Sequence, residues 1–148
     1  MTTTMLNIKE RPYSLLLITA AALFIALVFP PVAGIDFQDK TMFNIPIAIM
    51  VWIIPLFLIS IWMLYLLTNR IIYSFTLTRI HVILTVSTAI LIAIVLYIGI
   101  NPLQASTTDR QELIGNAIQI LFIIFICTQF TFLANIILGL LKKTSSPN

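Results

Sequence analysis

Four long apolar runs, separated by short polar segments, dominate the hydrophobic pattern of the chain. A helix that crosses a bilayer needs roughly 20 mostly apolar residues. The runs have about this length and cover approximately 13–30, 45–67, 80–98 and 113–141. They predict an all-α polytopic membrane protein, a single domain over 1–148 with four transmembrane helices. The first run could instead be the core of a signal peptide, although such cores typically have only about 7–15 residues.

Composition supports a membrane protein and removes several functional classes. Hydrophobic residues make up 60% of the 148 residues and charged residues 9%, whereas a soluble domain usually carries about 25% charge. The single Cys excludes an intrachain disulfide, and the single His excludes a multi-histidine metal or haem centre within one chain. Four Gly leave little room for a phosphate-binding loop. We therefore expect no cofactor and no enzymatic activity in the chain itself.

The positive charges are distributed unequally between the two sides of the predicted bundle. The net charge is +3, and the basic residues lie at the ends of apolar runs, which is typical of bilayer anchors rather than a nucleic-acid surface. Two of them, Lys40 and Arg110, lie in the first and third loops. Six lie in the tails and the second loop, 68–79: Lys9, Arg11, Arg70, Arg79, Lys142 and Lys143. The excess predicts that both termini are cytoplasmic, with the bacterial inner membrane as the expected location.

The predicted spans have no Asp, Glu, Lys or Arg in their middle parts. Proton carriers, ion-coupled transporters and voltage sensors usually depend on an ionisable group inside the membrane. This pattern argues against a pump or carrier that works alone. It favours a subunit of a complex or a protein that handles a hydrophobic substrate.

His81, the only histidine, lies one or two residues inside the third predicted span. On a helix, it shares a face with Thr85, Thr88 and Ala89. The functional interpretation is an axial haem or metal ligand, or a hydrogen-bond donor to a quinone. The structural interpretation is a histidine that bonds to headgroups or to a neighbouring helix. Because no second ligand accompanies it, we favour the structural interpretation and keep His81 as the candidate cofactor-binding residue.

The fourth predicted span carries a face of small and hydrogen-bonding residues, Thr128, Thr131, Asn135 and Gly139. Such faces pack helices together in lipid, where the hydrophobic effect provides no attraction between helices. We predict a helix-packing interface here and on the His81 face, with a polar substrate path as the alternative. In the same pattern, Tyr65 is typical of an aromatic belt residue at the membrane surface. Cys127 is expected to be an inert, buried thiol.

The stretch TNRIIYSFTLTRIH, followed by VILT, resembles a segment of haem-copper oxidase subunit I between its tenth and eleventh helices. The similarity covers residues 68–85, and the family's metal-ligand histidines have no counterpart here. The resemblance implies a degenerate relative or a small companion subunit. The matching positions are Thr68, Arg70, Tyr73, Leu77, Arg79, Ile80, His81, Leu84 and Thr85.

These observations predict a small non-catalytic subunit that packs against and stabilises a larger membrane complex, with a respiratory complex as the first candidate. Its expected partners are the bilayer and larger membrane subunits, and we expect no nucleic-acid partner. One alternative is a small homo-oligomeric transporter or channel. Another is a redox carrier that holds one haem between two copies of the chain.

Overall fold

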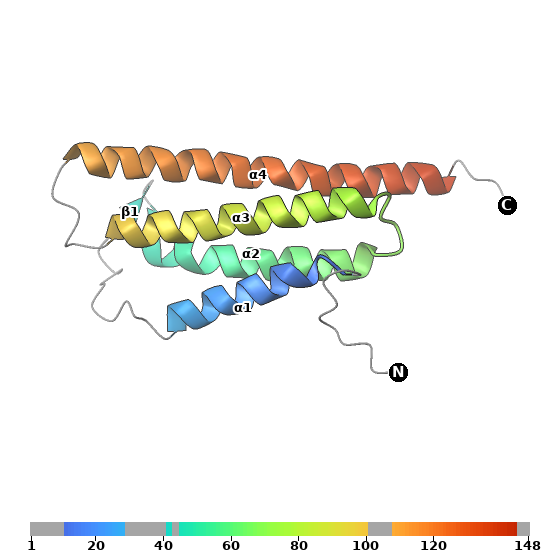
Figure 1. Ribbon diagram of the computed structural model, residues 1–148, viewed down its shortest axis with the longest axis horizontal. Coiled ribbons are helices and arrows are strands. Elements are labelled where there is room, and N and C mark those ends of the chain that lie inside the picture. The colour runs from blue at the N-terminus through green and yellow to red at the C-terminus, as the bar shows by residue number, and fades with distance from the viewer. Residues whose placement is uncertain (1–10, 29–40, 43–44, 101–107, 145–148) are drawn as a thin grey trace.

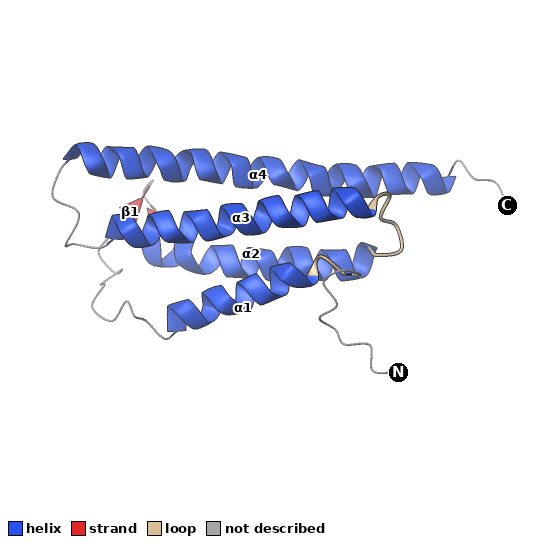
Figure 2. Cartoon of the chain, in the orientation of Figure 1, coloured by secondary structure: helices blue, strands red, loops and turns tan. Residues whose placement is uncertain are grey.

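The computed structural model describes residues 11–28, 41–42, 45–100 and 108–144, and within this part the fold is built from four α-helices (Figure 1). The predicted all-α class with four helices is confirmed (Figure 2). Two short strands, β1 (Thr41–Met42) and β2 (Ile45–Pro46), pair antiparallel before the second helix. The helices are α1 (Ser14–Val28), α2 (Ile47–Thr68), α3 (Phe75–Ile100) and α4 (Thr108–Thr144).

The four helices lie alongside one another as two close pairs (Figure 1). Helix α1 packs on α2, α3 packs on α4, and α1 also contacts α3. The start of α1, the loop 69–74 and the end of α4 lie at the same end of the bundle, which we call the loop end. The opposite end, where α3 ends and α4 begins, is called the far end.

Two helical segments of the described residues are long and apolar enough to cross a membrane. They are Phe75–Ile98 in α3 and Glu112–Lys142 in α4. The apolar segments of the other two helices, Ser14–Ala26 and Trp52–Thr68, are shorter. The structure therefore provides four helices, of which two meet the criterion for a span by length and composition.

Helix α3 begins five residues earlier than the hydrophobic pattern predicts, at Phe75 instead of about 80. Ser74 caps it: the Leu77 amide donates to the Ser74 hydroxyl oxygen at 3.5 Å, and the Thr78 amide donates to the Ser74 carbonyl at 3.2 Å. A serine at this position supplies an acceptor to a first-turn amide that has no partner within the helix. The loop consequently shortens to 69–74. His81, the seventh residue of α3, lies two turns inside the helix and not at its edge.

Boundaries of α2 and α4 also differ from the prediction. Helix α2 begins at Ile47, because Ile45 and Pro46 belong to β2. Helix α4 has 37 residues and extends beyond the predicted 113–141 at both ends. Lys9, Lys40 and residues 29–30, which entered the predictions of topology and of the first span, lie outside the described residues.

Cys127 is exposed on α4, so its predicted burial is wrong. The sequence around it is apolar on every side, and this suggested a core position. However, α4 is also apolar on the face that points away from the other helices, where Ile120, Ile123 and Phe130 are each more than half exposed. An apolar neighbourhood in the sequence therefore does not distinguish the inner face from the outer face of this helix.

Candidate functional site

His81 lies at the centre of a buried polar network that joins α2, α3 and α4. Its side chain has no solvent-exposed surface. The Tyr65 hydroxyl of α2 lies 2.8 Å from its Nδ1. On the other side of the ring, Nε2 lies 3.1 Å from Oε1 of Gln129 and 3.2 Å from the Thr85 hydroxyl. One imidazole ring thus connects three helices.

The hydrogen-bond directions around His81 can be derived from the α4 side of the network. Thr128 donates its hydroxyl proton to the Phe125 carbonyl at 2.7 Å, so it can only accept from Thr85, whose hydroxyl lies 3.3 Å away. Thr85 has then used its own proton, and it accepts from Nε2–H of His81. The same N–H points at the acceptor Oε1 of Gln129, since the Gln129 amide nitrogen donates to Phe125. A neutral ring then accepts the Tyr65 proton at Nδ1.

Aromatic rings surround the Tyr65–His81 pair. The Tyr13 ring stacks on Tyr65 with centroids 5.6 Å apart and an angle of 11° between the planes. The Phe132 ring of α4 packs edge-on against Tyr65 at 4.7 Å and lies 5.6 Å from the His81 ring. Tyr65 has no exposed surface, which corrects its interpretation as a belt residue at the membrane surface. The reason is its hydrogen bond to His81, which draws the hydroxyl inward.

Asn135 fastens α4 to the loop end through both ends of its side-chain amide. Its Oδ1 accepts from the Ser74 amide at 2.9 Å, and its Nδ2 donates to the Ser74 carbonyl at 3.1 Å and to the Thr78 hydroxyl at 2.9 Å. Its own backbone carbonyl accepts from the Tyr73 amide at 3.3 Å. Asn135 is 1% exposed. The arrangement satisfies the Tyr73 and Ser74 amides, which precede α3 and have no partner within that helix, and it gives the Ser74 carbonyl a second donor besides the Thr78 amide.

Gly139 allows the backbone of α4 to lie directly against the loop. A Cβ atom at this position would overlap the Ile71 carbonyl oxygen and would also reach the Tyr73 amide nitrogen at 3.0 Å. One turn of helix separates Gly139 from Asn135, so the close approach and the amide contacts occur at the same place. The contact requires a residue without a side chain.

The polar contacts between α3 and α4 repeat every two turns. Thr78 faces Asn135, and Thr85, seven residues later on α3, faces Thr128, seven residues earlier on α4. A spacing of seven residues keeps side chains on the seam between two packed helices. The two pairs therefore belong to one continuous α3–α4 interface, together with the buried His81.

The remaining residues predicted for this interface lie close to it but contribute differently. Ala89 is fully buried, and Thr88 is buried while its hydroxyl donates to the Leu84 carbonyl of its own helix at 2.7 Å. Thr131 is only partly buried. The structure brings His81, Thr85, Thr128, Asn135 and Gly139 to the α3–α4 interface or the adjoining loop end.

Sequence reasoning missed four members of the network, namely Tyr65, Gln129, Ser74 and Thr78. Helical spacing could have identified Thr78, because it lies seven residues before Thr85, whereas the signal for Gln129 was only its polar side chain beside Thr128. Tyr65 becomes a candidate once a short loop joins α2 and α3, since it then lies at nearly the same level as His81. The cap at Ser74 could not be found while the loop was taken to continue to Arg79.

The hydrogen-bond donors and acceptors of the network bond to other groups of the protein. Among the described residues, no buried side-chain nitrogen or oxygen lacks a hydrogen-bond partner. Nδ1 of His81 already accepts a hydrogen bond and Nε2 already donates, so neither nitrogen offers a free lone pair in this arrangement. The described part of the chain also contains no group of three His, Cys, Asp or Glu side chains that could hold a metal ion. Met63, the within-chain partner that an axial haem pair would need, is 55% exposed on α2.

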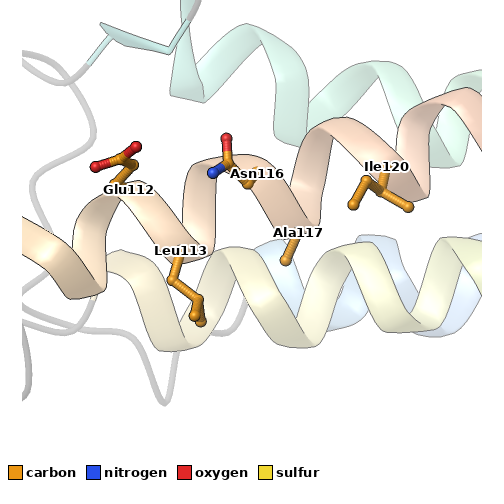
Figure 3. A pocket seen from close by; sticks show the side chains of 5 residues that line it. All are labelled: Glu112, Leu113, Asn116, Ala117 and Ile120. Atoms are coloured by element: carbon orange, nitrogen blue, oxygen red, sulfur yellow. The ribbon is translucent and has the colours of Figure 1, made fainter.

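A shallow, open hollow lies on the second to fourth turns of α4, towards the far end (Figure 3). Its described lining residues all belong to this one helix, and Glu112 and Asn116 project to one side while Leu113 and Ala117 project to the other (Figure 3). Residues from a single helix do not enclose a ligand, so this hollow is not a binding site of the usual concave kind.

Comparisons with known proteins do not assign the chain to a family. It matches no protein-family model, and no curated protein or solved structure is significantly similar to it. The functional argument therefore depends on the chain's own residues.

Proposed function

We propose that the chain is a small non-catalytic subunit of a larger membrane complex, with four transmembrane helices and both termini in the cytoplasm. The respiratory chain of a bacterial inner membrane is the first candidate, because residues 68–85 resemble a segment of haem-copper oxidase subunit I. In this proposal the chain packs against a larger subunit and stabilises it, and the polar network holds its own helices in register.

The two faces of α4 carry this proposal. The inner face is filled by contacts to α3 and to the loop end, including Thr128, Asn135 and Gly139. The outer face is uncovered and apolar along the helix, with exposed fractions of 55–64% at Ile120, Ile123, Phe130, Ile137 and Leu141. A subunit whose polar groups are used internally, and whose longest helix presents an apolar face, is suited to packing within a membrane.

Helices α1 and α2 support the proposal of four spans. Helix α2 has 22 residues, which corresponds to a length of roughly 33 Å at 1.5 Å per residue. The hydrocarbon core of a bilayer is about 30 Å thick. Because α1 packs on α2 and contacts α3, it would share the same membrane layer as the other helices.

Photo-crosslinking from the outer face of α4 tests the subunit proposal directly. A photoreactive phenylalanine analogue is placed at Phe130, which is 64% exposed, or in the matched control at Phe132, which is 4% exposed. We expect the Phe130 variant, irradiated in native membranes, to form adducts with a larger membrane protein, and the control to form none. Adducts only with a second copy would favour the homo-oligomeric transporter and overturn the subunit proposal. Absence of any protein adduct would also overturn it.

The proposed topology has its own test at the loop end. A cysteine introduced at Asn69, in a variant without Cys127, is labelled with a membrane-impermeant thiol reagent. We expect no labelling from outside intact cells and full labelling after permeabilisation, because Arg70 and Arg79 favour a cytoplasmic loop. Labelling of intact cells would contradict the proposed orientation.

A further inference from the structure

The described cationic side chains near helix ends gather at the loop end. Arg11 precedes α1, Arg70 lies in the loop, Arg79 lies in the second turn of α3 and Lys142 lies in the last turn of α4. All four are exposed. The acidic side chain that the structure describes on α4, Glu112, lies at the far end. The loop end is therefore a positively charged rim.

Two of these cations lie over aromatic rings on either side of Ser74. The Arg79 guanidinium is 4.9 Å from the centre of the Phe75 ring, and Nζ of Lys142 is 5.6 Å from the centre of the Tyr73 ring. The two rings are 43% and 49% exposed. A cation held over a ring is oriented without losing its charge.

The segment that carries these rings is fixed to the bundle. Asn135 binds the amide and the carbonyl of Ser74, which lies between Tyr73 and Phe75. Gly139 brings the backbone of α4 against Ile71 in the same loop. The two cation–aromatic pairs thus lie on or next to a loop that is held in place by the contacts of Asn135 and Gly139. These buried contacts set the positions of the pairs relative to the helix ends.

We propose that the rim formed by Arg70, Arg79, Lys142 and the rings of Tyr73 and Phe75 binds the headgroups of anionic phospholipids. This inference rests on the proposed membrane function, because it places the loop end at the level of the headgroups. Arg and Lys pair with phosphate oxygens, and exposed aromatic rings are enriched at this level of a membrane. A phospholipid is the occupant that matches both features, since its phosphate meets the cations while its acyl chains meet the apolar helices.

Competition between two lipids tests the inference on the purified full chain. The protein in mild detergent receives an equimolar mixture of phosphatidylglycerol and phosphatidylcholine with identical acyl chains, and native mass spectrometry gives the ratio of the two bound lipids. We expect the wild-type ratio to favour phosphatidylglycerol. Arg79→Gln or Lys142→Gln should each lower the ratio about fivefold, which corresponds to about 1 kcal/mol for one charge near an anionic surface.

Matched variants distinguish the effect of the rim on the lipid ratio from the effect of overall charge. Arg110→Gln removes the same charge at the far end and should leave the lipid ratio unchanged. Arg79→Lys keeps the charge at the rim and should retain most of the preference for phosphatidylglycerol. Raising the salt concentration should lower the ratio, because exposed charges are screened. Inorganic phosphate at 10-fold excess over lipid should not displace phosphatidylglycerol, since free phosphate lacks the acyl chains.

The inference is overturned if Arg79→Gln and Lys142→Gln leave the ratio unchanged, if Arg110→Gln lowers it equally, or if inorganic phosphate displaces the lipid. These results would leave the subunit proposal standing, because its readout is the protein adduct formed from Phe130. Failure of that crosslink with an intact lipid ratio would overturn the subunit proposal alone.

Discussion

The two helix pairs of this bundle are held together by different kinds of contact. Between α1 and α2 the buried side chains are mainly apolar, for example Leu16, Ala20, Leu58 and Ile61. Between α3 and α4 they include hydroxyls, amides and the His81 ring, and at Gly139 the backbone of α4 lies directly against the loop that leads into α3. Tyr65 links the first pair to the second by its hydrogen bond to His81.

The difference matters most in a bilayer. Lipid chains are as apolar as leucine, so burying leucine between helices gives little preference for one partner over another. Close backbone approach and directed hydrogen bonds do discriminate between partners. We therefore expect the α3–α4 pair to determine which helices associate and in which register. We expect the α1–α2 pair to be positioned mainly by the shapes of its apolar side chains. The predictions below test this division, starting with the largest effect.

Gly139→Ala should cause the largest loss of stability. Its methyl group would overlap the Ile71 carbonyl, and the backbone must move because no flexible side chain can yield. Overpacking of this kind costs up to about 3 kcal/mol, measured as the free energy of unfolding in mixed micelles. Gly115→Ala is the control, since a Cβ there has no neighbour within 4 Å. Equal effects of the two substitutions would refute the special role of the close contact between α4 and the loop at Gly139.

Asn135→Leu should weaken the same contact by a smaller amount. The substitution removes three side-chain hydrogen bonds to the loop end, and such bonds average about 0.6 kcal/mol each in membrane proteins. We expect a loss of roughly 2 kcal/mol in the same unfolding assay, with normal membrane insertion. Asn116→Leu, at an exposed position of the same helix, should have little effect.

Tyr65→Phe should produce a modest change. The ring and its stacking on Tyr13 remain, and only the hydroxyl that bonds to His81 is lost. We expect a loss of about 0.6 kcal/mol. Tyr97→Phe provides the control, because Tyr97 is 47% exposed. A loss several times larger would show that the link between the two helix pairs is as important as the α3–α4 interface.

The visible absorption spectrum should show no haem bound through His81. We expect the purified chain, incubated with haem, to develop no Soret band that depends on His81, because both ring nitrogens already have partners. His81→Ala is compared with the wild type under the same conditions. A band that disappears in the variant would make His81 a ligand and would favour the redox-carrier alternative.

The number and type of the helices followed from the sequence because they depend on the lengths of the apolar runs. The ends of the helices did not. Hydropathy placed the start of α3 after Arg79, whereas the capping serine, Ser74, places it five residues earlier. A charged residue near a helix end can remain in the helix while its side chain extends outward, so Arg79 was a poor marker of the boundary.

Periodicity within one helix allowed members of the candidate site to be predicted from the sequence, whereas contacts between helices could not be predicted in this way. His81, Thr85 and Thr128 could be placed on helix faces from their spacing alone. That Tyr65 reaches His81 depends on the separation of α2 and α3, which the sequence does not specify. The exposure of Cys127 was also beyond the pattern, because the inner and outer faces of α4 are both apolar there.

The contact between Asn135 and Ser74 spans 61 residues of the chain, and this has a consequence for biosynthesis. Ser74 emerges from the ribosome well before Asn135, so its amide must wait for the last helix, whereas its carbonyl already accepts from the Thr78 amide. Until α4 arrives, the amides of Tyr73 and Ser74 lack the acceptors that Asn135 supplies. A chain truncated before Asn135 would keep these two amides without the partners that the last helix supplies.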